Sequence, residues 1–190
     1  MEEVKDTYDN FIIGDKEPKE TLKYHSDEIW CSTVLKDGRF VTGSKDNSII
    51  IYNNKIFKPD LIIKEHNKGV TCVIQLNSGE LVSCSWDNTI KLYNINENEY
   101  KVIQTLNEHK DYVNKIIELK NKQLVSCSCD ESIIIYNKDN NKYKKDYSIL
   151  TNGENGPIIQ IKDNEICYYE SNGGTICFYD FIKRKNKRER

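Results

Sequence analysis

The sequence predicts an all-β protein built from about four copies of one four-stranded antiparallel sheet. Two observations support this fold class. Three stretches align without gaps, and each alternates apolar and polar residues around a polar turn: FVTGSKDNSIIIYN (40–53), LVSCSWDNTIKLYN (81–94) and LVSCSCDESIIIYN (124–137). Their turn aspartates, Asp46, Asp87 and Asp130, are 41 and 43 residues apart. Alternation around a short turn is typical of a β-hairpin, and a fixed spacing of this length is typical of a repeat protein.

Each repeat predicts the order strand, turn, strand, turn, strand, loop, strand. In the second repeat the strands are expected at 70–76, 81–85, 89–94 and 100–106. The segments Asn77-Ser78-Gly79 and Asp87-Asn88 between them consist of residues that favour tight turns. Because one four-stranded sheet cannot bury both of its faces alone, the repeats indicate stacked sheets, as in the blades of a β-propeller.

The repeats divide the chain into four blades and two terminal segments. A fourth copy, CYYESNGGTICFYD (167–180), follows the third and lacks the aspartate at its turn. The blades are expected at 21–64, 65–107, 108–150 and 151–180. Residues 1–20 are expected to form a partly flexible N-terminal segment, and residues 181–190 a basic tail that makes a poor outer strand.

Composition narrows the class of protein further. A length of 190 residues suits one domain, and a net charge of −2 gives no overall attraction to nucleic acid. No apolar run is long enough to span a membrane, and the acidic N-terminus does not resemble a secretory signal. The seven cysteines form no C-x-x-C pair. We therefore expect free thiols in a reducing compartment, the cytoplasm or the nucleus.

Each of the first three repeats also carries a histidine, a hydroxyl residue, an aspartate and a tyrosine at one fixed spacing. The hydroxyl follows the histidine by 17 residues, the aspartate follows by 4 more and the tyrosine by 6 more. The three sets are His25-Thr42-Asp46-Tyr52, His66-Ser83-Asp87-Tyr93 and His109-Ser126-Asp130-Tyr136. A turn carboxylate can accept hydrogen bonds from the imidazole and from turn amides, and the imidazole can then contact the hydroxyl. The sets are therefore predicted to brace their own blades.

The same residue types form the catalytic triad of serine hydrolases. Three identical sets in one chain favour a structural role, because a hydrolase needs only one. The sequence has no nucleophile motif, phosphate-binding glycine loop or spacing of metal ligands outside the sets. We expect no enzymatic activity, no metal site and no cofactor.

With these sets the chain resembles the WD-repeat (WD40) family of β-propellers over residues 21–180. The family has a tryptophan at the fourth position of the set, where this chain has Tyr52, Tyr93, Tyr136 and Tyr179. The resemblance therefore does not fix the fourth hydrogen bond. In the last repeat Gly173 replaces the turn aspartate, Tyr169 replaces the hydroxyl and no histidine precedes them. This blade is expected to be looser.

Four repeats leave three architectures open, because propellers contain about four to eight blades. The chain can be part of a larger propeller, it can form an eight-bladed ring with a second copy, or residues 21–24 can complete the fourth blade of a small closed ring. We favour a partial or truncated propeller.

The resemblance also implies which residues meet a partner. In the family, the residue before the turn aspartate and the third and fifth residues after the histidine lie on one rim of the propeller, here called the rim face. These positions are Glu28, Trp30, Lys45, Gly69, Thr71, Trp86, Tyr112, Asn114 and Cys129. Both tryptophans of the chain fall in this set, and binding hot spots are enriched in tryptophan and tyrosine. For Trp86, packing on a neighbouring blade is the alternative.

The sequence thus predicts a non-catalytic scaffold that binds a protein or peptide on its rim face. One alternative is an adaptor or targeting domain of a larger protein, such as one associated with a ubiquitin ligase or a kinase. A second alternative is association with nucleic acid through the basic residues 183–190, which the near-zero net charge disfavours.

Overall fold

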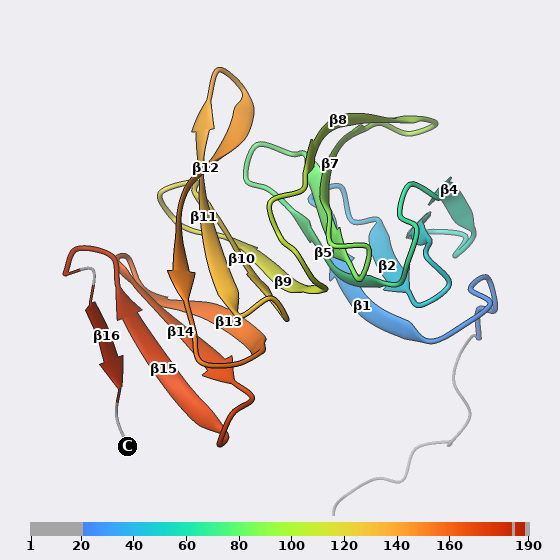
Figure 1. Ribbon diagram of the computed structural model, residues 1–190. Helices are drawn as coiled ribbons and strands as arrows, with labels where there is room; N and C mark the ends of the chain where they lie inside the picture. Colours follow the sequence, from blue (N-terminus) through green and yellow to red (C-terminus); the bar gives the residue numbers. More distant parts are fainter. Residues whose placement is uncertain (1–20, 184, 189–190) are drawn as a thin grey trace, which may run out of the picture.

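Figure 1 shows a computed structural model of the protein, in which four antiparallel sheets are arranged side by side in an arc. The structure describes residues 21–183 and 185–188, and every regular element among them is a strand. Each sheet is made of four strands that are consecutive in the chain, so each sheet is one blade. The prediction of an all-β partial propeller is confirmed.

The strands follow the expected repeats. Blade 1 contains β1 (Ile29–Val34), β2 (Phe40–Ser44), β3 (Ile49–Tyr52) and β4 (Pro59–Ile63). Blade 2 contains β5 (Val70–Gln75), β6 (Leu81–Ser85), β7 (Ile90–Ile95) and β8 (Tyr100–Leu106). Blade 3 contains β9 (Val113–Glu118), β10 (Leu124–Ser128), β11 (Ser132–Asp139) and β12 (Lys142–Leu150). Blade 4 contains β13 (Asn155–Lys162), β14 (Glu165–Glu170), β15 (Thr175–Asp180) and β16 (Lys185–Arg188).

The core lies between the blades. Strand β5 packs on β1 and β2, β9 on β5 and β6, and β13 on β9 and β10. Side chains alternate between the two faces of a strand, so each blade has a forward face toward the next blade and a backward face toward the preceding one. Between blades 2 and 3, for example, Val82 and Leu92 of the forward face are buried with Ile116 and Leu124 of the backward face. Burial of these apolar faces is the main force that stacks the blades.

A recurring polar contact, here called the clasp, joins each blade to the one before it. The last residue of β5 or β9, or its equivalent in β13, accepts a hydrogen bond from a turn amide of the preceding blade. Gln75 Oε1 accepts from the Lys36 N–H at 2.8 Å, Glu118 Oε2 from the Asn77 N–H at 2.7 Å and Gln160 Oε1 from the Lys120 N–H at 3.0 Å. The clasp fixes which turn meets which strand, whereas apolar packing alone is non-directional.

Blade 4 departs from the sequence expectations in two ways. Ile166 pairs with Tyr179 as Leu124 pairs with Tyr136, so its hairpin is one residue longer and Tyr168, rather than Tyr169, occupies the position of the hydroxyl. The basic segment was expected to make a poor outer strand, yet β16 pairs with β15 and completes the sheet. Backbone pairing needs no particular side chain, which is why a basic sequence can take this place.

Residues 21–24 form no strand, which contradicts the closed-ring architecture in which they supply the outer strand of blade 4. That place is taken by β16. The expectation for the N-terminal segment, residues 1–20, lies outside the described residues.

Candidate protein-interaction rim

The three histidine sets have the same geometry in blades 1, 2 and 3. In each, Nδ1 of the histidine lies 2.9 Å from Oδ2 of the turn aspartate, and Nε2 lies 2.7 Å from the hydroxyl oxygen. The aspartate is part of an Asx-type turn: in blade 2, Asp87 Oδ1 accepts from the N–H and the hydroxyl of Thr89, and its Oδ2 accepts from the Asn67 N–H. One carboxylate thus ties the turn to the loop that carries the histidine.

The tautomer of each histidine follows from these partners. An ionised carboxylate can only accept, so Nδ1 carries the proton, and in a neutral ring Nε2 then accepts from the hydroxyl. The tyrosine stands next in the chain of contacts: Ser83 Oγ lies 3.2 Å from the Tyr93 hydroxyl, and Thr42 Oγ1 lies 3.4 Å from the Tyr52 hydroxyl. In blades 1 and 2 the tyrosine therefore occupies the place of the fourth partner, with a longer contact in blade 1.

The hydrogen bonds also hold the aspartates in the ionised form. Burial on its own would raise the pKa of Asp87, but the hydrogen bond and charge of His66, together with Thr89 and the Asn67 amide, lower that pKa well below its usual value. Burial would also raise the pKa values of Asp130 and Asp46, but hydrogen bonds lower both. The largest lowering contribution comes from His109 for Asp130 and from Ser48 for Asp46.

The stability of the fold is therefore expected to depend on pH. Because the folded-state pKa values are depressed, the three aspartates stabilise the fold above the unfolded value of about 3.9, and this contribution is lost as the pH falls below about 4. We expect the free energy of unfolding in urea to fall between pH 5 and pH 3, by an amount that shrinks when one of these aspartates is replaced by asparagine. An unchanged slope in such a variant would contradict this account.

The geometry is unsuited to hydrolysis. The Ser83 and Ser126 side chains are fully buried, so neither hydroxyl can reach a substrate. Among the described residues, no group of three or more His, Cys, Asp or Glu side chains could hold a metal ion. All seven cysteines are free. Burial raises the pKa of the Cys31 thiol to about 12, so it resists forming a reactive thiolate.

One repeated backbone hydrogen bond brings the predicted rim residues together. The amide of the residue before the turn aspartate donates to the carbonyl of the third residue after the histidine. These bonds join Lys45 to Glu28, Trp86 to Gly69 and Cys129 to Tyr112, at 2.9, 3.0 and 2.9 Å. The same rim position in each blade is therefore presented by the same local geometry.

Three aromatic rings from three blades form a continuous row on this rim, here called the aromatic row. The Trp86 ring stacks on Tyr112, with ring centres 4.9 Å apart and an angle of 14°. The centre of the Trp30 ring lies 4.4 Å from the centre of the Trp86 ring, and the two rings are tilted by 48°. A Cβ atom on Gly69 would lie 2.4 Å from the Trp30 ring, which explains the glycine at this position. All three rings are half-buried, so the row both joins the blades and keeps a surface open to solvent.

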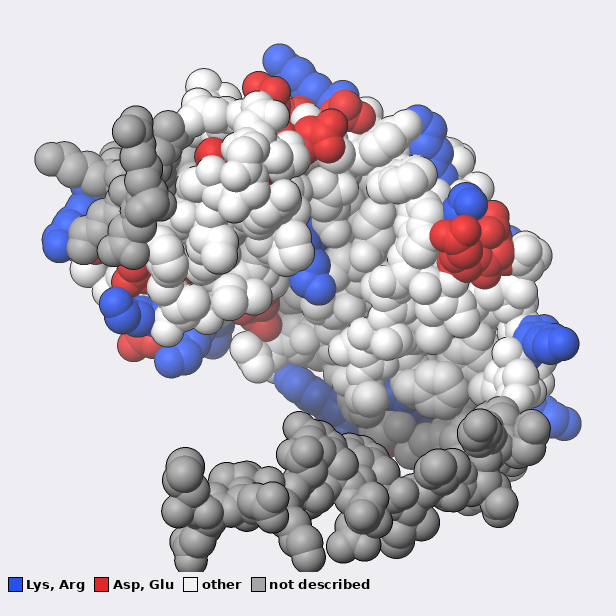
Figure 2. All heavy atoms as spheres, turned by 90° about the horizontal axis from the view of Figure 1, so that it is seen from below, with Lys and Arg blue, Asp and Glu red and all other residues white. Residues whose placement is uncertain are grey.

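Charged groups flank the aromatic row. Glu28 accepts from the Trp30 indole N–H at 3.0 Å and pairs with Lys45 at 3.4 Å, and these contacts, the indole first, lower the pKa of Glu28. At the opposite end the Lys68 ammonium lies 5.0 Å above the centre of the Tyr112 ring. Figure 2 shows the molecule from below the view of Figure 1, and on this side uncharged residues cover most of the middle while charged residues lie mainly toward the edges.

Thr71 and Asn114 have a different environment from the other predicted rim residues. Thr71 Oγ1 donates to the Val113 carbonyl at 2.6 Å, and Asn114 Nδ2 donates to the Asn155 carbonyl at 2.7 Å. Both bonds reach the first strand of the next blade. The Asn114 amide also lies 3.3 Å from the half-buried Cys129 sulfur. These side chains join blades, and their polar groups are already used within the chain.

Sequence reasoning missed Lys68 and the clasp residues. Lys68 is the second residue after a histidine, a position that the family resemblance does not assign. The clasp had a signal in the sequence, because Gln75, Glu118 and Gln160 recur at the period of the repeat. The signal is weak, since glutamine and glutamate are common on exposed strand positions.

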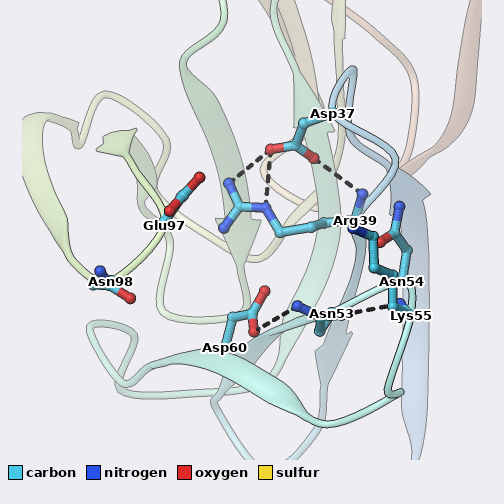
Figure 3. A pocket seen from close by; sticks show the side chains of 8 residues that line it. All are labelled: Asp37, Arg39, Asn53, Asn54, Lys55, Asp60, Glu97 and Asn98. Atoms are coloured by element: carbon cyan, nitrogen blue, oxygen red, sulfur yellow. Dashed lines mark hydrogen bonds and ion pairs between the residues drawn. The ribbon is translucent and has the colours of Figure 1, made fainter.

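A polar hollow lies on the opposite rim, between blades 1 and 2 (Figure 3). It is lined by Asp37, Arg39, Asn53, Asn54, Lys55, Asp60, Glu97 and Asn98. Its central guanidinium, from Arg39, is paired with Asp37 at 2.8 Å and donates to the Asn96 carbonyl at 3.1 Å. Because this cation is satisfied within the chain, the hollow is a weaker candidate for a binding site than the aromatic row.

The stacked sheets, their buried histidine sets and the aromatic rim define a repeat protein of the β-propeller class. The family model described as "WD domain, G-beta repeat" matches residues 16–53, 57–94 and 100–137. The chain therefore belongs to the WD40 repeat family, which generally provides scaffolds for protein interactions and is usually non-catalytic. The family model does not extend over blade 4, in keeping with its altered turn.

A comparison with solved structures agrees with the assignment to the WD40 repeat family. The chain is similar to the crystal structure of the WD40 β-propeller domain of Doa1, with a TM-score of 0.73 and 25% sequence identity. The match covers 86% of this chain and 54% of that chain, so this chain spans about half of the propeller domain that it matches. A search of curated proteins finds no sequence match. None of the described residues belongs to a helix that could cross a membrane.

Proposed function

We propose that the chain is a non-catalytic scaffold that binds a protein or peptide partner on its rim face, with the aromatic row as the anchor. The observation that carries this proposal is that Trp30, Trp86 and Tyr112 come from three different blades and meet in one half-buried row. Large rigid rings supply contact area at a small cost in conformational entropy, and they dominate binding energy at many interfaces.

The charges beside the row suggest how a partner is selected. Glu28, held by Trp30 and Lys45, offers a carboxylate at one end, and the Lys68 ammonium stands over Tyr112 at the other. A partner segment that inserts an apolar or aromatic side chain between these ends, with a basic group toward Glu28, fits this pattern. Charges at the edge of an interface influence selectivity and association rate more than total affinity.

The two tryptophans make the proposal testable without a label, because the chain has no others. Peptides selected from a display library on the immobilised chain are titrated into the protein in solution. We expect each binding peptide to change the intensity or wavelength of tryptophan emission, since both indoles lie on the rim. Peptides that bind tightly and leave the emission unchanged would place the binding surface elsewhere.

Nucleic-acid association through the basic segment remains a prediction, and its test has to leave strand β16 in place. Deleting residues 183–190 would remove β16 from blade 4, so truncation would confuse loss of charge with loss of structure. Substitution of Lys185 and Lys187 by glutamine keeps the backbone that pairs. We expect little binding of duplex DNA at physiological salt for either protein. Strong binding by the natural chain that is lost in the variant and weakens steeply with salt would favour the nucleic-acid function instead.

A further inference from the structure

Exposed large apolar side chains gather on the two outermost sheet faces of the described chain. On the backward face of blade 1, Tyr24, Ile29, Val34 and Ile62 are 44%, 53%, 69% and 49% exposed. On the forward face of blade 4, Ile159, Ile161, Tyr169 and Ile176 are 56%, 40%, 38% and 55% exposed. Figure 1 shows these two blades at opposite ends of the arc. Exposed apolar patches of this kind usually mark an interaction surface.

The two faces correspond to the two sides of the interfaces inside the chain. Ile176 pairs with Tyr169 as Ile133 pairs with Cys127, and Ile133 and Cys127 are buried against blade 4. Ile29 pairs with Ser44 as Val70 pairs with Ser85, and Val70 is buried against blade 1. The forward face of blade 4 therefore has the form that receives a backward face, and blade 1 presents one.

The two end faces lack the polar groups that join neighbouring blades inside the chain. The clasp acceptor at the position of Gln75 is Val34 in blade 1, since Val34 pairs with Phe40 as Gln75 pairs with Leu81. The donor is altered in blade 4, where the first turn is shortened and Lys162 pairs directly with Glu165. A residue that closes a two-residue hairpin has its N–H within the ladder. Gly156 stands where Asn114 donates to the next blade, so this donor is absent as well.

We propose that a second copy of the chain binds head to tail, with the forward face of blade 4 on the backward face of the partner's blade 1. One of these faces lacks the clasp donor and the other lacks the clasp acceptor. Their contact therefore buries no clasp group without its partner. Two such contacts close a pair of chains into a ring of eight blades, within the range that propellers form.

The test is the mass of the 190-residue chain in solution, measured by sedimentation equilibrium over a series of concentrations. Three variants place one charge each: Ile29→Lys on blade 1, Ile176→Glu on blade 4 and Leu150→Glu on neither face. Ile29 is chosen because its equivalent Val70 is buried with Ile49, the equivalent of Ile176. Leu150 is 78% exposed and serves as the matched control. We expect twice the mass of one chain for the natural protein and for Leu150→Glu, and the mass of one chain for the other two variants, with thermal unfolding confirming that all are folded.

Mixing the Ile29→Lys and Ile176→Glu proteins is the decisive step. A mixed pair has one natural contact and one contact in which lysine faces glutamate, so the double mass should return. A natural protein with the mass of one chain overturns the proposal. The proposal is also overturned if Ile176→Glu loses the double mass while the blade 1 variant keeps it, because that pattern indicates contact between two blade 4 faces. A mixture that stays at the mass of one chain overturns it as well. None of these outcomes affects the rim face, because the aromatic row belongs to neither end face.

Discussion

Replacing Asp87 by asparagine is expected to lower the free energy of unfolding by about 2–4 kcal/mol. Asp87 accepts four hydrogen bonds, from His66, the Asn67 amide, and the amide and hydroxyl of Thr89. An asparagine has one accepting oxygen, and its NH₂ group would face donors on the other side. At least one donor then loses its partner in a nearly buried site, and bonds to a charged acceptor contribute more than neutral ones.

The measurement is equilibrium unfolding in urea at pH 7, with Asp163→Asn as the matched control. Asp163 also pairs with a cation, Lys120 at 2.8 Å, but both side chains are about three-quarters exposed. Exposed pairs contribute little, so the control should stay within about 1 kcal/mol of the natural protein. If Asp87→Asn and Asp163→Asn destabilise equally, the histidine sets do not brace the blades.

Truncating Trp86 to alanine is expected to weaken binding of a rim-face peptide by at least about 2 kcal/mol, roughly thirty-fold in Kd. The central ring of the row is lost, and Trp30 and Tyr112 are left without the surface that joins them. The two ring contacts also contribute to stacking of blades 1, 2 and 3. We therefore expect a loss of folding stability of about 1–2 kcal/mol in the same variant.

The control for this loss is Phe57→Ala. Phe57 is an exposed aromatic residue in the loop between β3 and β4, and its ring contacts Phe40 rather than the aromatic row. Affinity is measured by calorimetry well below the unfolding temperature of each variant. A fall in affinity for Trp86→Ala with unchanged affinity for Phe57→Ala supports the rim anchor. Reduced stability without a change in affinity would leave Trp86 a packing residue only.

The sequence was most informative where one pattern recurs. The fixed spacing of His66, Ser83 and Asp87, found again in blades 1 and 3, predicts the hairpin turns and the contacts within each set. Binary alternation did the same for strand bounds, as in blade 2, where β5 to β8 lie within one residue of expectation. Both patterns reflect local geometry, in which backbone spacing alone decides which side chains meet.

Contacts between blades were harder to predict, because their geometry depends on how sheets stack. Thr71 and Asn114 occupy rim positions by repeat number, yet their side chains turn toward the next blade and bond its first strand. The extra residue in the hairpin of blade 4 shifted Tyr168 into the place expected for Tyr169. The pairing of Lys185–Arg188 as β16 left no trace in the sequence, since a strand at a sheet edge can be formed by backbone alone.

The clasp has a consequence for how the number of blades can change. Blade 2 carries both halves, with Gln75 directed to the blade before it and the Asn77 amide to the blade after it. A tandem duplication of this module would lengthen the arc and keep every such bond. Moving the first module to an internal place would leave the turn amide of the preceding blade without an acceptor, because Val34 stands at the acceptor position. Growth by copying is therefore tolerated in the middle of the array, and the order of its modules is not freely interchangeable.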